Sequence, residues 1–117
     1  MLLGVACWLD PDSRGFGTHQ QLGLPPCTFS SVFGIRCPSC GMTTSWSHAL
    51  RGELVLAARS NAGGLLLALL SVLSGPWLLV SGIRGNWTGW YPNEWIVVVV
   101  GGVVLMTTLI DWIWRCL

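Results

Sequence analysis

Lysine is absent from this chain of 117 residues, and charged side chains make up only 9% of it. All six basic residues are arginines, five residues are acidic, and the net charge at pH 7 is +1. So small a basic excess leaves no cationic surface for a phosphate backbone, which excludes nucleic acid as a partner. The chain also lacks charge runs, serine- and proline-rich linkers and internal repeats. We therefore predict a single domain over residues 1–117.

The first residues lack the features of a secretory signal. Residues 1–9 are apolar, but no basic residue opens the stretch and it ends at Asp10-Pro11. A signal peptide has a basic start, a longer apolar region and a small-residue cleavage site, so this interpretation is rejected. Two alternatives stay open. The stretch is either a half-length segment at the membrane interface or re-entering the membrane, or the truncated end of a third span that begins upstream.

Apolar residues are abundant where charge is scarce. They form 52% of the sequence, which includes eight tryptophans, and the mean hydropathy is +0.62. Residues 61–83 and 95–114 run almost wholly apolar for about 20 residues each, the length of a helix that crosses a bilayer. We therefore predict an all-α membrane protein with two full transmembrane helices and the lipid bilayer as its first partner.

The segment before the first span predicts a loop and a surface helix. Residues 10–40 are rich in Gly, Pro, Ser, Thr and Gln, which indicates a polar loop that carries cysteines. Residues 41–60 contain few helix breakers, and Trp46, Leu50, Leu54 and Ala57 fall at helical spacing. This pattern favours an amphipathic interfacial helix. The preceding Cys37-Pro38-Ser39-Cys40 is typical of a helix start, because proline is tolerated in a first turn.

Polar and small residues near the spans predict tertiary contacts. Asp111 lies four residues before Arg115, which favours an ion pair along one helix. Asn61 and Arg59, at the entrance to the first span, are placed to hydrogen-bond with the Cys37 segment. Close helix packing is predicted at two glycine pairs, either between the two spans or with a second copy or another membrane protein: Gly63-Gly64 and Gly101-Gly102.

The distribution of arginines predicts an orientation. Arg36, Arg51 and Arg59 precede the first full span, whereas the loop after it holds one arginine and is crowded with aromatic residues. Under the positive-inside rule, Cys37 and the C-terminus face the cytoplasm. The expected location is the cytoplasmic membrane, with a multi-pass topology.

Cys27, Cys37 and Cys40 have the spacing of metal ligands. The C-x2-C spacing of the last two lets a tight turn present both sulfurs to one tetrahedral ion, and zinc is the cofactor that this set indicates. A fourth ligand is then required. His48 lies eight residues beyond Cys40, roughly 12 Å along a helix, which excludes it. His19 or a water is geometrically easier.

Two other interpretations of the cysteines stay open. Cys37 and Cys40 could be a redox pair, in which one thiolate exchanges and the other resolves a mixed disulfide. No βαβ pattern surrounds them, so a thioredoxin-like fold is excluded. Alternatively the cysteines are small buried hydrophobes, as we predict for Cys7 and Cys116. Nothing near His48 forms a pattern of nucleophile and base.

Several motifs in order carry a family resemblance: Asp10-Pro11, Pro26-Cys27-Thr28-Phe29, Cys37-Pro38-Ser39-Cys40-Gly41-Met42-Thr43-Thr44, His48-Ala49-Leu50-Arg51-Gly52-Glu53-Leu54 and Asn61. In these motifs the chain resembles the small bacterial membrane proteins catalogued as domain of unknown function 2752. Thr44 stands where many members have arginine. The resemblance implies an integral protein of the bacterial inner membrane and attaches no activity to it. We therefore predict a non-catalytic accessory or scaffold component, with a membrane thiol-disulfide oxidoreductase as the alternative.

Overall fold

The structure is all-helical over the part of the chain that it describes. The computed structural model describes residues 2–11 and 18–117, apart from the side chains of Leu2 and His19, and no strand occurs among them. The predicted all-α class is therefore confirmed. The elements in chain order are α1 (Leu2–Trp8), the 3-10 helix η1 (Thr18–Leu22), α2 (Thr28–Phe33), α3 (Met42–Leu50), α4 (Leu54–Ser60), α5 (Ala62–Arg84) and α6 (Glu94–Cys116).

Helices α5 and α6 are the two candidate membrane spans. Each has 23 residues and is long and apolar enough to cross a bilayer. Asn61 caps α5 by accepting a hydrogen bond from the backbone N–H of Gly64, and Asn93 caps α6 in the same way through Ile96. Both helices lie within two residues of their predicted bounds. Helix α5 continues through Pro76.

The distribution of side chains suits a protein whose long helices face lipid. Only 11% of the apolar window of α5 and 0% of that of α6 is buried inside the protein. The buried side chains are instead small, and many are polar. In lipid the hydrophobic effect does not drive helices together, so hydrogen bonds and close packing hold them. Besides the glycines, the buried residues of the described chain are Ala6, Leu9, Thr18, Thr44, Ser45, Ser47, Ala57, Ser60, Asn61, Ala68 and Ser81.

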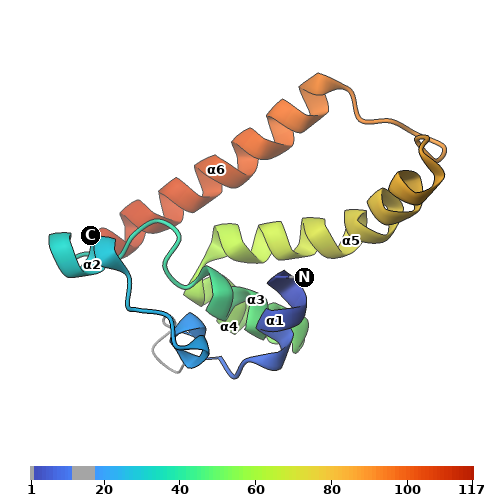
Figure 1. Cartoon of the computed structure of the whole chain (residues 1–117). Helices are drawn as coiled ribbons and strands as arrows, with labels where there is room; N and C mark the ends of the chain where they lie inside the picture. The colour runs from blue at the N-terminus through green and yellow to red at the C-terminus, as the bar shows by residue number, and fades with distance from the viewer. Residues whose placement is uncertain (1, 12–17) are drawn as a thin grey trace.

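Figure 1 shows α5 and α6 approaching each other where α5 begins and α6 ends, and separating toward the loop that joins them. The close approach uses Gly63, where an added Cβ would lie 1.9 Å from Thr108 Oγ1. Its neighbour Gly64 contacts α3 instead, and its carbonyl accepts a 3.0 Å hydrogen bond from Trp46 Nε1. Nothing lies within 4 Å of a Cβ at Gly101 or Gly102, so that pair makes no contact within the described chain.

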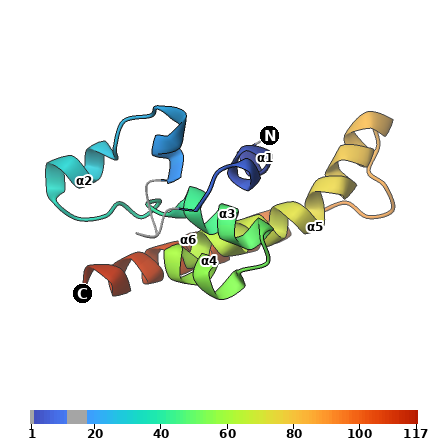
Figure 2. The ribbon, with the colours of Figure 1, turned by 90° about the horizontal axis from the view of Figure 1, so that it is seen from below.

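Three short helices gather beside the first half of α5. Figures 1 and 2 show α3 and α4 against it and α1 packed on α3, with α2 set apart toward the C-terminus. Hydrogen bonds through buried hydroxyls join these helices: Ser47 Oγ donates to the carbonyl of Leu9 at 2.7 Å, and Ser45 Oγ to that of Asn61 at 2.9 Å. Helix α1 is too short to cross a bilayer.

The segment from 10 to 60 differs from its prediction in three ways. The expected helix over 41–60 is two helices, because Gly52 has a φ of +81° and turns the chain between α3 and α4. The predicted apolar stripe is divided, because Ala57 is fully buried, Trp46 and Leu50 are partly buried, and Leu54 is 48% exposed. The loop over 10–40 contains η1 and α2, short helices without the apolar periodicity that sequence inspection detects.

Candidate metal centre

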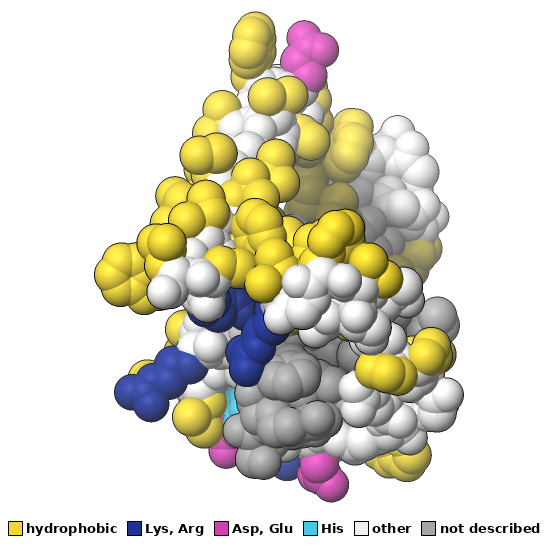
Figure 3. Space-filling view, turned by 90° about the vertical axis from the view of Figure 1, so that its left-hand side faces the viewer, with side chains coloured by type: hydrophobic (Ala, Val, Ile, Leu, Met, Phe, Trp, Pro, Cys, Tyr) yellow, Lys and Arg dark blue, Asp and Glu magenta, His cyan; other side chains and the backbone are white. Residues whose placement is uncertain are grey.

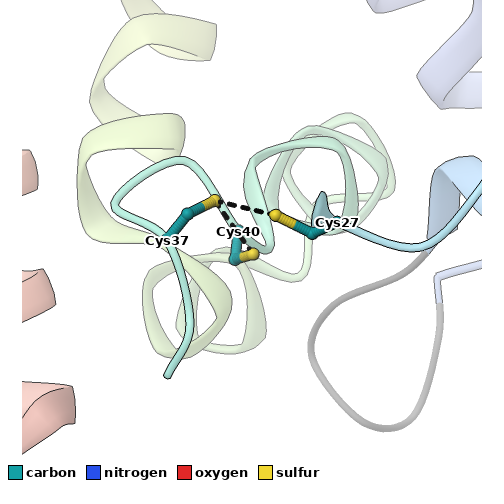
Figure 4. A group of neighbouring side chains, drawn as sticks. All are labelled: Cys27, Cys37 and Cys40. Carbon is teal, nitrogen blue, oxygen red and sulfur yellow. Dashed lines mark hydrogen bonds between the residues drawn. The ribbon is translucent and has the colours of Figure 1, made fainter. Parts of the chain in front are cut away.

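The three cysteines of the predicted ligand set lie together. Cys27 immediately precedes α2, while Cys37 and Cys40 belong to the turn before α3. The sulfur of Cys37 is 3.0 Å from that of Cys40 and 3.5 Å from that of Cys27, and all three sulfurs lie within 4.8 Å of one another. Figure 4 shows the side chains pointing toward one another. Their role as metal ligands stays a prediction.

A tight turn places two of the sulfurs. The N–H of Cys40 donates to the carbonyl of Cys37 at 3.1 Å, and the N–H of Met42 donates to that of Ser39 at 3.1 Å. Gly41 ends the turn with a φ of +84°, a left-handed conformation that glycine adopts without strain. Helix α3 then begins at Met42. The four residues predicted to start the helix thus form the turn before it, and α3 begins one residue after the predicted position 41.

The site makes Cys37 and Cys40 chemically unequal. Burial acts to raise the pKa of Cys37, but hydrogen bonds with Cys40, Ser39 and Cys27 outweigh it, and the net effect lowers that pKa. Burial also raises the pKa of Cys40, and its hydrogen bond to Cys37 adds to this, bringing the value to about 12. The turn thus favours one thiolate beside one thiol, since a single proton is shared between neighbouring sulfurs.

Asn61 ties the cysteine turn to the first span. Its side chain is fully buried, and Nδ2 donates to the carbonyls of Pro38 and Cys40 at 3.1 and 3.3 Å. The same side chain caps α5 through Oδ1. The predicted contact between Asn61 and the Cys37 segment is confirmed, whereas Arg59, predicted beside it, is exposed on α4.

Helix α6 reaches the same turn from the other end of the sequence. Arg115 Nη1 donates to the carbonyls of Cys40 and Ser60 at 3.3 and 2.9 Å, and its Nη2 forms the predicted ion pair with Asp111 at 2.7 Å. Trp112 Nε1 donates to the carbonyl of Arg36 at 2.5 Å. Sequence reasoning missed these two contacts to the cysteine loop. The available signal was an ion pair at the end of an otherwise apolar span.

A cavity of about 420 Å3 opens beside the sulfurs. All three cysteines line it, together with Arg36, Trp46 and hydroxyl side chains such as Ser39. The cysteine centre therefore borders a space large enough for a small molecule.

Other residues singled out in the sequence lie elsewhere. His48 Nδ1 pairs with Glu53 Oε2 at 2.5 Å, so a carboxylate does stand beside it, and it is outside the cysteine cluster as its spacing predicted. The prediction that Cys7 and Cys116 are buried is wrong, because both are exposed. Thr44 is buried and shares a hydrogen bond with Thr18. The side chain of His19 lies outside the described residues.

Residues 27–75 match the family model described as Protein of unknown function (DUF2752). The chain therefore resembles that family. The matched region begins at Cys27 and includes the cysteine turn, Asn61 and the first half of α5, so it contains the complete cysteine set. No curated protein and no solved structure matches the chain.

Proposed function

We propose that this protein is a non-catalytic accessory or scaffold component of a membrane, whose three cysteines hold a structural zinc ion. The observation that carries the proposal is the position of Cys27. It comes from a separate segment, yet its sulfur lies 3.5 Å from that of Cys37. A third sulfur has no part in a two-cysteine exchange reaction, whereas a tetrahedral thiolate site requires it.

Zinc would join parts of the chain that few other contacts hold. Cys27 lies at the start of α2, a six-residue helix with no buried residue, so packing alone does little to fix it. Thiolate bonds from Cys27, Cys37 and Cys40 would anchor this helix to the turn before α3. Asn61 and Arg115 hold that same turn against both spans. Metal binding would thus stabilise the end of the protein where the spans meet.

The test is metal content and thiol count on the purified protein in detergent. Zinc coordination predicts about one equivalent of zinc and three thiols that react only after a chelator is added. Cys27→Ser, Cys37→Ser and Cys40→Ser should each remove the metal, because each deletes one ligand. Cys7→Ser and Cys116→Ser are the matched controls and should retain it. Metal-free protein, or equal effects at all five positions, would contradict the proposal.

We also propose that the protein is a multi-pass protein of the bacterial inner membrane with its cysteine centre on the cytoplasmic side. The apolar helices α5 and α6 and the arginine distribution support this. In Figure 3 hydrophobic side chains cover the upper part of the face shown, and basic side chains gather below them. The apolar surface suits contact with lipid, and the basic side chains suit the polar layer beside it.

A membrane thiol-disulfide oxidoreductase is the second candidate, favoured by the lowered pKa of Cys37 beside Cys40. In this reaction the Cys37 thiolate would attack a substrate disulfide and release one substrate thiolate. Cys40 would then lose its proton and attack the Cys37 sulfur of the mixed disulfide. This forms the Cys37–Cys40 disulfide and releases the second substrate thiolate, so the protein is oxidised and the substrate reduced. Cys40→Ser should trap the mixed disulfide with substrate. Its recovery from cells would favour this candidate over a zinc centre.

A further inference from the structure

We propose that the cysteine centre is an open metal site, whose fourth coordination position faces the neighbouring cavity and takes a small neutral donor ligand of the imidazole or water type. The inference rests on the proposed metal centre. Zinc in proteins is almost always bound by four ligands. In closed structural sites the protein supplies all four, whereas a site with three protein ligands keeps the fourth position for a water or another exogenous group. Among the described residues the cluster supplies three, Cys27, Cys37 and Cys40.

The described carboxylates and His48 are engaged elsewhere. Asp10 pairs with Arg51, Glu53 with His48, and Asp111 with Arg115. Glu94 begins α6, far along the chain from the centre. None of these acidic residues lines the cavity beside the sulfurs, and neither do His48, Cys7 and Cys116. The described chain therefore brings no fourth side chain of the kinds that zinc prefers to this cavity.

The cavity has room for such a ligand. Its volume is about 420 Å3, and its wall contains all three cysteines. A water molecule occupies about 30 Å3 in the liquid, so the space exceeds what one water fills. Two hydroxyls on the wall already have partners, since Ser31 Oγ donates to the carbonyl of Cys27 and Ser39 Oγ bonds the sulfur of Cys37. A ligand bound to the metal would lie in this space.

The charge of the metal site favours a neutral ligand. Three thiolates and one divalent ion carry a net charge of −1. A neutral donor leaves this charge unchanged, whereas a carboxylate or a fourth thiolate would bring it to −2 in a partly buried site. The ligand class is therefore a neutral nitrogen or oxygen donor.

Cobalt substitution tests the open position. Co2+ replaces zinc in tetrahedral sites, and its absorption bands report the ligand set, so imidazole is titrated into the cobalt-loaded full chain in detergent. We expect a saturable shift of the bands both in the wild type and in His19→Ala. A shift in His19→Ala alone would mean that His19 fills the position, and would overturn the inference. An unresponsive cobalt site in both proteins would overturn it too, with the metal centre intact. Failure to bind cobalt would overturn the metal centre itself.

Filling the cavity tests the location of the ligand. Ser30 on α2 lines the cavity, whereas Val32 on the same helix does not and is 69% exposed. Ser30→Trp should retain cobalt and weaken imidazole binding at least about tenfold, and the matched Val32→Trp should behave as wild type. Thr43→Phe fills the cavity from α3 and replaces Ser30→Trp if that variant does not fold. Unchanged imidazole binding in the filled variant would overturn the inference.

Discussion

At the residue scale, the chemistry of the centre depends on the different pKa values of two neighbouring thiols. Cys37 has a lowered pKa, while that of Cys40 is raised to about 12. Only a thiolate is nucleophilic, so the fraction of thiolate at a given pH sets the alkylation rate. In metal-free protein, iodoacetamide should therefore alkylate Cys37 before Cys40.

We predict that at pH 8 metal-free Cys37 is alkylated at least about tenfold faster than Cys40, because Cys40 stays protonated until the pH approaches its raised pKa. Raising the pH to 10 should accelerate Cys40 more than Cys37, because the lowered pKa of Cys37 leaves less of its thiolate still to form. Peptide mass spectrometry after timed alkylation measures both rates, with the exposed Cys116 as the reference thiol. Equal rates at pH 8 would contradict the shared-proton arrangement.

Asn61 carries the second prediction at this scale. Asn61→Ser keeps a capping oxygen for α5 but removes the two hydrogen bonds to the cysteine turn. The turn carbonyls then lose buried partners, which costs about 1–3 kcal/mol. We expect a lower unfolding temperature in detergent. Asn93→Ser, the same change at the exposed cap of α6, is the matched control and should change it little. Similar shifts in both variants would show that capping alone matters.

At the element scale, the packing of α5 on α6 depends on one glycine. A Cβ at position 63 would lie 1.9 Å from Thr108 Oγ1 and 3.0 Å from Thr108 Cα. The second atom belongs to the backbone, so a new rotamer of threonine would leave the contact too close. The helices must therefore move apart to accept any side chain at this position.

Gly63→Ala should destabilise the protein by about 1–3 kcal/mol, the usual cost of overpacking. Gly101→Ala is the matched control, since nothing lies within 4 Å of its Cβ, and should be neutral in the isolated chain. The measurement is thermal unfolding in detergent. If Gly101→Ala is as harmful as Gly63→Ala, the second glycine pair is also a packing surface, with a partner outside the chain.

At the scale of the whole molecule, the two ends of the helix pair differ in chemistry. The cysteine centre, Arg115 and most of the buried hydroxyls lie where α5 begins and α6 ends. At the opposite end, Trp77 stacks on Trp87 with ring centroids 5.5 Å apart, and Trp90 lies 5.9 Å away. Tryptophan favours the headgroup layer, which suits this end to the outer interface.

This polarity predicts the topology. In a variant with its native cysteines replaced, Asn86→Cys in the exposed loop between the spans should react with a membrane-impermeant maleimide on intact cells. A chain that keeps only the exposed Cys116 should react after lysis alone. Mass-tagging on gels reads both results. The reverse pattern would place the cysteine centre outside the cell.

The sequence by itself determined the two spans and the pairing of Cys37 with Cys40. Both are local properties. A run of about 20 apolar residues must satisfy its backbone as a helix in lipid, and a C-x2-C turn brings its two sulfurs together whatever surrounds it. The ion pair of Asp111 with Arg115 was predictable for the same reason, since residues four apart meet on a helix.

Only the tertiary structure decided what surrounds that turn. Cys27 joins it from ten residues away, and the side chain of Arg115 reaches the carbonyl of Cys40 across 75 residues. Such contacts depend on how the chain folds back on itself, and no local sequence pattern predicts this. The break at Gly52 also appeared only in the structure, because glycine is tolerated within helices and ends one only where packing turns the chain. The three cysteines were thus predicted as a set from the sequence, and their role as ligands stays a prediction. The contacts around them and the cavity depend on helix packing.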